Sequence, residues 1–170
     1  MLFRSAKDAR SQQRLKDQFE RREPDRKYLA LVYGHPDPAQ GTWRHRLAWD
    51  SRALEQRQAP ARDPRGVEAI SSYRVVERFR ETSLLEVTLQ TGKRNQIRIQ
   101  AALLGHPLVG EQQYVYGDPS SAAIDFPRQA LHAWRLAFRH PVDGRTVRVE
   151  APVPRDLTSL LEGLRCGVHT

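Results

Sequence analysis

Two runs of alternating apolar residues, followed directly by a helical pattern, limit the folds that are open to this 170-residue chain. Small or apolar side chains recur at every second position at Ala69, Ser71, Tyr73 and Val75 and again over Leu85–Leu89, with a polar turn at 81–83. This period of two is typical of antiparallel strands that bury one face. Thr91-Gly92 then ends the second strand, and over 97–104 the apolar spacing becomes that of a helix. The pattern predicts a strand that runs straight into the N-terminus of a helix.

The flanking segments extend this prediction with strands and helices of ordinary length. They are a helix that starts at a capping box of Ser5 and Asp8 and is closed by Pro24, a buried strand at 27–33, a hairpin of strands 131–138 and 146–150, and a final helix at 157–164. The polar, arginine-rich stretch 51–66 is predicted to be an exposed loop. We therefore expect an α+β fold, with a mixed, largely antiparallel sheet flanked by helices, formed by residues 1–170 as a single domain.

The charge of the chain indicates a polyanionic partner. Lys and Arg together number 28 against 20 Asp and Glu, which gives a formal charge of +8 and a pI near 10.2. Only four of the basic residues are lysines, and guanidinium groups both bind phosphates and stack on bases. A solvated surface encoded by a GC-rich genome would give the same balance, so charge alone does not decide for RNA.

Cysteine content and hydropathy bear on the compartment. The single cysteine, Cys166, excludes an intrachain disulfide, and no stretch has the length of a membrane span or the form of a secretory signal. We expect a cytoplasmic protein without a membrane partner.

Polar and cationic residues gather where the strand meets the predicted helix. Free backbone N–H groups and the helix dipole already favour an anion at this end, and Lys93, Arg94 and Arg98 add three positive charges. The neighbouring amides, which can bond a base edge or a sugar hydroxyl, are Asn95, Gln96 and Gln100. The segment predicts a phosphate or RNA site, with an ordinary amphipathic helix as the alternative.

The same segment resembles the RluA-type RNA pseudouridine synthases, in which a strand ending in Leu-x-Thr-Gly-Arg continues into a His-Gln-Ile-Arg helix. The matching stretches here are Leu89-Gln90-Thr91-Gly92-Lys93-Arg94-Asn95-Gln96-Ile97-Arg98, Gly105-His106-Pro107-Leu108-Val109-Gly110-Glu111, Tyr116-Gly117, Arg26 to Gly34 with the family's tyrosine at Tyr28, Leu131-His132-Ala133, His140-Pro141 and Ala151-Pro152-Val153-Pro154. Several ordered motifs that cover essentially the whole chain are far more specific than any one of them. The departures are Lys93 for arginine, Asn95 and Gln100 for histidines, and Glu111 for aspartate.

The resemblance implies an RNA uridine isomerase of ribosomal or transfer RNA that uses no metal and no organic cofactor. Uracil would be detached from C1′, turned and rejoined through C5, with an aspartate as nucleophile or equivalent catalyst. Tyr28 would stack on the uracil and is a candidate for moving the C5 proton, while Arg98 would pair with the aspartate and keep it ionised. The target uridine must be flipped out of its stack. The residues expected to contact RNA are Lys93, Arg94, Asn95, Gln96 and Gln100.

The aspartate itself is the difficulty. In the family it belongs to a His-Arg-Leu-Asp motif before the first helix, and here that helix begins almost at Met1, so we expect the aspartate upstream of residue 1. His45-Arg46-Leu47 looks similar, but Ala48 occupies the critical position and the segment follows the tyrosine strand. Neither this segment nor Asp50 is assigned the catalytic role.

Three interpretations stay open at this point. The chain is a fragment or a mis-started product of an active synthase, or it is a shortened relative that binds RNA without isomerising it. The first is favoured because Tyr28 and Arg98 persist. A general phosphate-binding or DNA-binding domain is the third, and it predicts equal binding to duplex DNA and structured RNA.

A metal site is not predicted. The irregular spacing of Glu111, Asp118 and Asp125 is typical of turn residues and not of metal ligands.

Overall fold

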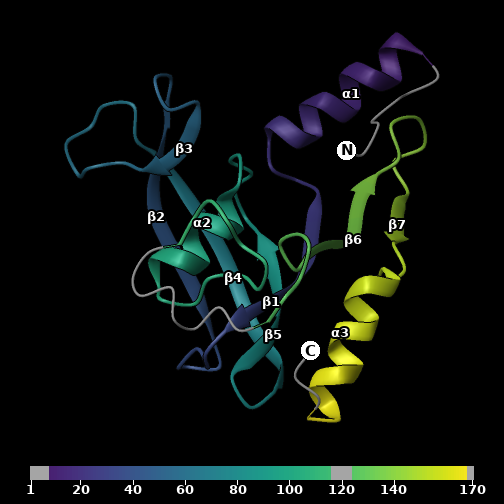
Figure 1. Ribbon diagram of the computed structural model, residues 1–170. Helices are drawn as coiled ribbons and strands as arrows, with labels where there is room; N and C mark the ends of the chain where they lie inside the picture. Colours follow the sequence, from purple (N-terminus) through teal and green to yellow (C-terminus); the bar gives the residue numbers. More distant parts are fainter. Residues whose placement is uncertain (1–7, 116–123, 168–170) are drawn as a thin grey trace.

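One antiparallel sheet runs through the molecule (Figure 1). The structure is a computed structural model that describes residues 8–115 and 124–167. In chain order the strands are β1 (Asp25–Tyr33), β2 (Gln40–Asp50), β3 (Glu55–Gln58), β4 (Val67–Arg78), β5 (Thr82–Leu89), β6 (Leu131–Arg139) and β7 (Thr146–Glu150). They lie side by side in the order β3-β2-β4-β5-β1-β6-β7, and each neighbouring pair is antiparallel. The α+β prediction is confirmed, but within the described residues the sheet is wholly antiparallel and not mixed.

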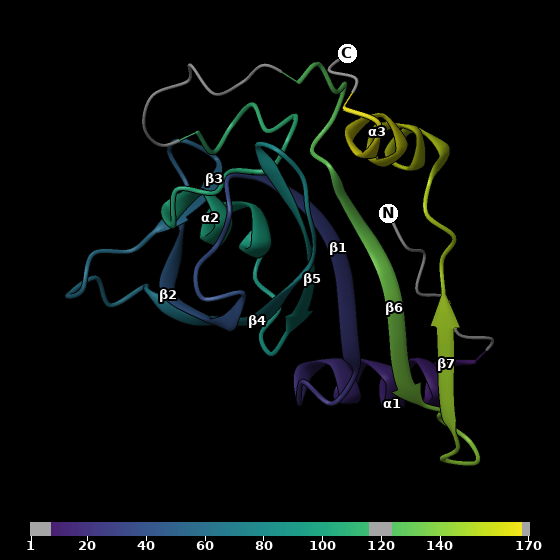
Figure 2. The same ribbon diagram turned by 90° about the horizontal axis from the view of Figure 1, so that it is seen from below.

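In the described part of the chain, the helices α1 (Ala9–Glu20), α2 (Gln96–Leu103) and α3 (Arg155–Arg165) flank this sheet. Figure 2 shows that β2, β4 and β5 curve around α2, while α3 lies apart from it, beyond β6. In the same view α1 crosses the far ends of β1 and β6. No helix in the described part of the chain is long and apolar enough to cross a membrane.

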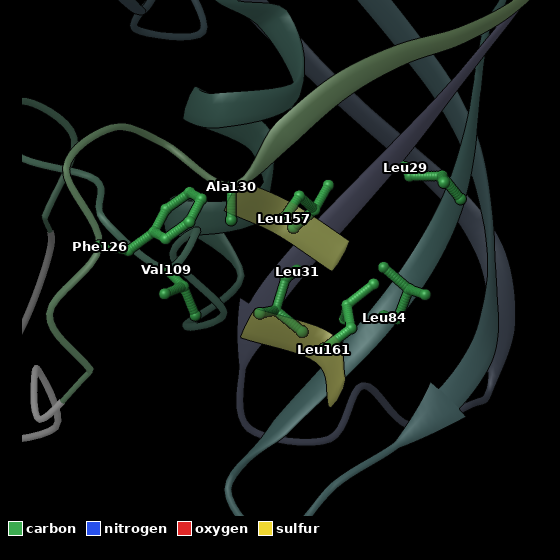
Figure 3. Close-up of a cluster of buried hydrophobic side chains, with 8 residues drawn as sticks. All are labelled: Leu29, Leu31, Leu84, Val109, Phe126, Ala130, Leu157 and Leu161. Carbon is green, nitrogen blue, oxygen red and sulfur yellow. The ribbon is translucent and has the colours of Figure 1, made fainter. Parts of the chain in front are cut away.

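Strand β1 separates two hydrophobic cores because its alternate side chains point to opposite faces. Leu31 packs with Leu84 of β5 and with Leu157 and Leu161 of α3, as Figure 3 shows. The neighbouring positions Ala30 and Val32 belong to the second core, under α2. A strand buried on both faces explains the continuous apolar run that predicted it.

Helix α1 is capped by a different residue from the one expected. Asp8 is the N-cap, and its carboxylate accepts hydrogen bonds from the backbone N–H and the hydroxyl of Ser11, both at 2.8 Å. The expected cap, Ser5, lies outside the described residues. The helix is attached to the β6–β7 hairpin because Gln18 donates to the carbonyl of Arg139 (2.8 Å) and accepts from its N–H (2.9 Å).

Strands β2 and β3 were not expected. In β2 the buried Trp43 and Leu47 are separated by Arg44 and Arg46. The segment therefore shows no clear apolar alternation in the sequence. The four-residue β3 lies inside the stretch 51–66 that was predicted to be a loop, and it forms the edge of the sheet beside β2. The predictions of the other strands and of α2 and α3 are confirmed to within a few residues.

Candidate active site

A close contact and an unusual backbone conformation shape the entrance to α2. The guanidinium of Arg26 on β1 lies against Gly92, so a side chain at this position would have to displace the end of the Arg26 side chain. Asn95 then adopts a left-handed backbone (φ 54°) at the N-cap position, which asparagine tolerates better than most residues. The chain thus turns sharply from β5 into a helix whose first residues lie against the sheet.

Gln96 fastens this turn to the sheet. Its amide oxygen accepts hydrogen bonds from the Thr91 hydroxyl (2.7 Å) and the Lys93 N–H (3.0 Å), and its amide nitrogen donates to the Ile70 carbonyl (3.0 Å) and the Ser71 hydroxyl (2.9 Å). The side chain is almost completely buried.

Gln100 repeats this arrangement one turn further along the helix. Its amide oxygen accepts from the Ser71 hydroxyl (2.6 Å), and its nitrogen donates to the carbonyls of Trp43 (3.2 Å) and Ala69 (3.0 Å). Gln100 is fully buried, like Gln96. The expectation that these two amides face RNA is therefore corrected: they lie between helix and sheet, where their hydrogen bonds are used within the protein.

Arg98 is held by Glu111 in a bidentate pair. The guanidinium Nε and Nη2 each donate to a carboxylate oxygen at 2.6 Å. The side chain of Glu111 has no exposed surface and that of Arg98 is 15% exposed. Burial by itself raises the pKa of Glu111, but the hydrogen bonds from Arg98 and from the N–H groups of Gln113 and Tyr114 together lower it. These hydrogen bonds favour the ionised carboxylate, and the largely buried pair is held in one orientation.

The remaining side of Arg98 faces Asn95 and Tyr114. Its Nη1 donates to the Asn95 side-chain oxygen at 3.4 Å, and its guanidinium carbon lies 5.0 Å from the centre of the buried Tyr114 ring. The amide of Asn95 donates to the Tyr114 hydroxyl (3.0 Å). Of the three guanidinium nitrogens of Arg98, Nη1 makes the longest hydrogen bond within the described residues.

Tyr28 lies on the same side of the sheet as α2. It is a half-buried residue of β1 that packs against the core formed by Ile97 and Ala101, opposite Val87 of β5. No hydrogen bond or ring contact joins Tyr28 to Arg98 within the described residues. The structure places the two expected catalytic side chains on one face without direct contact between them.

The two cations that precede the helix remain accessible. Lys93 is half-buried and Arg94 is exposed, with its guanidinium carbon 4.9 Å from the centre of the Trp49 ring on β2. Sequence reasoning missed both Trp49 and the role of Glu111, because Trp49 lies on the unexpected strand β2 and a pairing across thirteen residues leaves no periodic signal. The expected Tyr116-Gly117 motif lies outside the described residues.

The segment that resembles the aspartate motif carries no carboxylate at the required position. His45 to Ala48 is part of β2, where Ala48 is buried and burial lowers the pKa of His45. Asp50 ends this strand and pairs with Arg57 at 2.9 Å. Among the described residues no aspartate lies within ion-pair distance of Arg98, and no group of three or more His, Cys, Asp and Glu is arranged to hold a metal ion.

The fold and the site define a class of protein: an α+β domain with a tyrosine on the interior strand β1 and a clamped arginine on the helix above the same face. A family model described as RNA pseudouridylate synthase matches residues 2–103, which is more than half of the chain. The chain belongs to this family.

Curated relatives and a solved structure agree with this assignment. An uncharacterised RNA pseudouridine synthase of Mycobacterium bovis is 42% identical over 158 residues, which cover 89% of this chain and 48% of the relative. Ribosomal large subunit pseudouridine synthase D of Nitrosomonas europaea is 38% identical over 177 residues, covering 97% and 48%. The human protein RNA pseudouridylate synthase domain containing 1 shares the fold, with a TM-score of 0.72 at 24% identity over 94% of this chain and 73% of that one. The chain thus spans about half the length of the curated relatives that it matches.

Proposed function

We propose that residues 1–170 are the C-terminal major part of the catalytic domain of an RNA pseudouridine synthase, which isomerises a specific uridine in ribosomal or transfer RNA. Ribosomal RNA of the large subunit is favoured, since a relative that covers nearly the whole chain is named for it. In the reaction the bond from C1′ to N1 breaks, a bond from C1′ to C5 forms, C5 gives up its proton and N1 gains one, so that product and substrate have the same atoms.

The observation that carries the proposal is the fixed guanidinium of Arg98. An arginine that must orient a catalytic carboxylate cannot be free to swing, because a small misplacement of the reacting group costs much of the rate. Glu111 occupies Nε and Nη2 of Arg98 and leaves Nη1 for another carboxylate. Arg98 would therefore act as a bridge, held by one acid and holding the other.

Tyr28 is proposed to stack on the flipped uracil. A half-buried tyrosine on the interior strand β1 has a fixed backbone and one accessible part, which suits stacking against a flipped uracil. Lys93, Arg94 and Asn95 lie at the helix entrance and are proposed to contact the RNA backbone. Gln96 and Gln100 are left out of this set because both are buried.

The nucleophilic aspartate is proposed to lie upstream of residue 1, as the family resemblance implies. The relatives are about twice as long as this chain, and the carboxylate found against Arg98 is Glu111, whose oxygens are already bonded. The alternative, an RNA-binding module without chemistry, is favoured by the same lack of an aspartate near Arg98. Both proposals share the RNA surface and differ only in turnover.

Pseudouridine formation on transcribed ribosomal and transfer RNA tests the proposal. We expect turnover by the full-length gene product and none by the isolated 170 residues. Arg98→Ala in the full-length protein should abolish turnover while most RNA affinity remains, since affinity is spread over many phosphate contacts. Arg145→Ala, in the exposed turn between β6 and β7, is the matched control and should change neither.

Each other outcome has a definite meaning. Turnover by the 170 residues alone would show that the aspartate lies within them. A full-length protein that binds RNA but never forms pseudouridine would support the binding module. Equal affinity for duplex DNA and structured RNA in a competition titration would favour a general phosphate-binding domain instead.

A further inference from the structure

The β2–β3 hairpin brings an exposed aromatic ring to the rim of the candidate active site. Trp49 lies near the end of β2, directly beneath the guanidinium of Arg94. Glu55, at the start of β3, accepts a hydrogen bond from the Gln113 side chain (3.2 Å), and the N–H of Gln113 in turn donates to Glu111 (2.9 Å). The hairpin is therefore fastened to the loop that holds Arg98.

The ring of Trp49 is not needed by the hydrophobic core. Trp43, which points to the same face of β2, is 5% exposed and stacks on Tyr73 with ring centres 4.8 Å apart. Trp49 is 37% exposed and belongs to none of the three buried clusters of described residues. A large aromatic side chain kept partly in solvent beside a cation is typical of a surface that binds a planar group.

The surroundings of Trp49 are basic. The Arg46 guanidinium donates to the carbonyls of Ala61, Asp63 and Gly66 and so joins β2 to the loop that follows β3. Within the described residues, Arg52 and Arg62 on this hairpin and loop are exposed and make no ion pair. These positive charges favour a polyanion near Trp49.

The tip of the hairpin exposes an apolar side chain. Leu54 has a left-handed backbone (φ 53°) and is 71% exposed. This conformation is unfavourable for a large L residue, and the exposed side chain gains no burial in return. The apolar side chain stays at the surface, next to the arginines and close to the end of the strand that carries Trp49.

We propose that an unpaired nucleobase of the RNA, outside the target uridine, stacks on the surface formed by Trp49 and Arg94. The inference rests on the proposed function, because it assumes that RNA enters at α2. Indole and guanidinium groups are planar, and both stack on bases whatever their sequence. A base within a duplex has both faces covered, so the surface selects single-stranded or looped RNA close to the modified position.

Binding of labelled RNA oligonucleotides to the full chain tests the inference. The probes are a twelve-nucleotide single strand and the same strand in a duplex, with circular dichroism melting as the check of folding. Trp49→Ala should weaken binding of the single strand about tenfold, the effect of losing one stacked base. Duplex affinity and the dependence of affinity on salt should stay unchanged, because no phosphate contact is lost. Trp49→Phe, which keeps an aromatic face, should retain most of the affinity.

Trp134 is the matched control, since it also carries an arginine over its ring, Arg135 at 3.6 Å, but lies on β6. Trp134→Ala should leave affinity for the single strand unchanged. An effect of Trp49→Ala below twofold, or an equal loss for single strand and duplex, would overturn the inference.

The two proposals fail separately. If Arg98→Ala abolishes turnover in the full-length protein while Trp49→Ala leaves single-strand binding intact, the proposed function stands and the stacking surface does not. If Trp49→Ala weakens binding but the full-length protein never forms pseudouridine, the stacking surface stands and the isomerase does not.

Discussion

The pairs Arg98–Glu111 and Arg165–Glu77 are built alike and placed differently. In both, guanidinium Nε and Nη2 donate to the two oxygens of one glutamate, at 2.6 Å each in the first pair and at 2.8 and 2.7 Å in the second. The side chains of the first pair are 15% and 0% exposed, and those of the second 49% and 32%. Burial is thus the main variable between them.

The difference shows what each pair can do. Water screens an exposed pair, so Arg165–Glu77 joins α3 to β4 without fixing either side chain strongly. A dry pair is costly to form but more costly to break, because removal of one partner leaves a buried charge alone. Arg98 is thus held in one orientation by a penalty that Arg165 does not face, which is the property that a positioning arginine needs.

The largest effect is expected from Glu111→Ala. The change leaves the Arg98 guanidinium without its carboxylate in a dry setting, and it should lower the free energy of unfolding by about 3–5 kcal/mol. Urea unfolding followed by circular dichroism measures this, with an unchanged slope as the sign that the folded state keeps its compactness. A loss below about 1 kcal/mol is the range of exposed pairs, and it would contradict the conclusion that burial makes the Arg98–Glu111 pair more costly to break than Arg165–Glu77.

The double variant Arg98→Met with Glu111→Leu is the control for this prediction. It removes both charges together and fills the space with apolar groups, so it should be more stable than Glu111→Ala alone. If the double variant loses at least as much stability, the cost comes from the volume that is removed and not from the unpaired charge.

Glu86→Gln should have an intermediate effect. The Glu86 carboxylate is buried on the opposite face of the sheet, where it accepts from Lys27 (3.2 Å) and from Arg74 (3.2 and 3.1 Å). An open hollow of about 370 Å³ is lined by Glu86 and Arg74, and the side chains of Arg74 and Lys27 are 57% and 31% exposed. We expect a loss of about 1–2 kcal/mol in urea unfolding, since solvated cations remain behind and a neutral amide can still accept one hydrogen bond. A loss as large as that of Glu111→Ala would mean that burial of the carboxylate alone determines the loss in free energy of unfolding, whatever the exposure of its partners.

The strands and helices differ in how well the sequence predicts them. The strands β1, β4, β5, β6 and β7 and the helices α2 and α3 have clear apolar periods, and they were predicted. Strand β2 was missed because arginines separate its buried residues, and β3 was missed because a four-residue edge strand has no period to detect. Local pattern therefore predicts elements whose apolar spacing is visible in the sequence, and it misses strands whose buried residues are separated by arginines or are too few to show a period.

The site was predicted in position and only partly in detail. The cluster at the entrance of α2 was found from its charges, and the importance of Arg98 came from the family resemblance. The buried roles of Gln96 and Gln100 could not be read, because the sheet position that they face is Ser71, so polar residues lie on both sides of the contact. The pairing of Glu111 depends on the fold of the loop after α2, which no local pattern encodes.

A pH titration of stability tests the contribution of the ionised Glu86 carboxylate. Hydrogen bonds from Arg74 lower the pKa of Glu86 below 4.5 in the folded protein, despite burial. The stability that ionised Glu86 contributes is therefore fully present above about pH 4.5 and is lost as the pH falls through the lowered folded value. The stability difference between the parent and Glu86→Gln should shrink as the pH falls below 4.5, as measured by urea unfolding at each pH. A difference that grows in acid would contradict the assigned direction.

The smallest effect is expected from Glu77→Gln. The pKa of Glu77 is lowered chiefly by its hydrogen bonds from Arg165, but solvent around this pair discounts that shift as a measure of stability. We expect a loss of about 0.5 kcal/mol or less at low salt, and no measurable loss in 1 M sodium chloride, where the screening length is about 3 Å. The loss caused by Glu111→Ala should persist in the same salt, because ions do not reach a pair with no exposed carboxylate surface. If both losses vanish together, the Arg98–Glu111 pair is solvated in solution and Arg98 is not fixed by it. If both persist, the α3 contact is drier than its exposure indicates, and burial no longer distinguishes the two pairs.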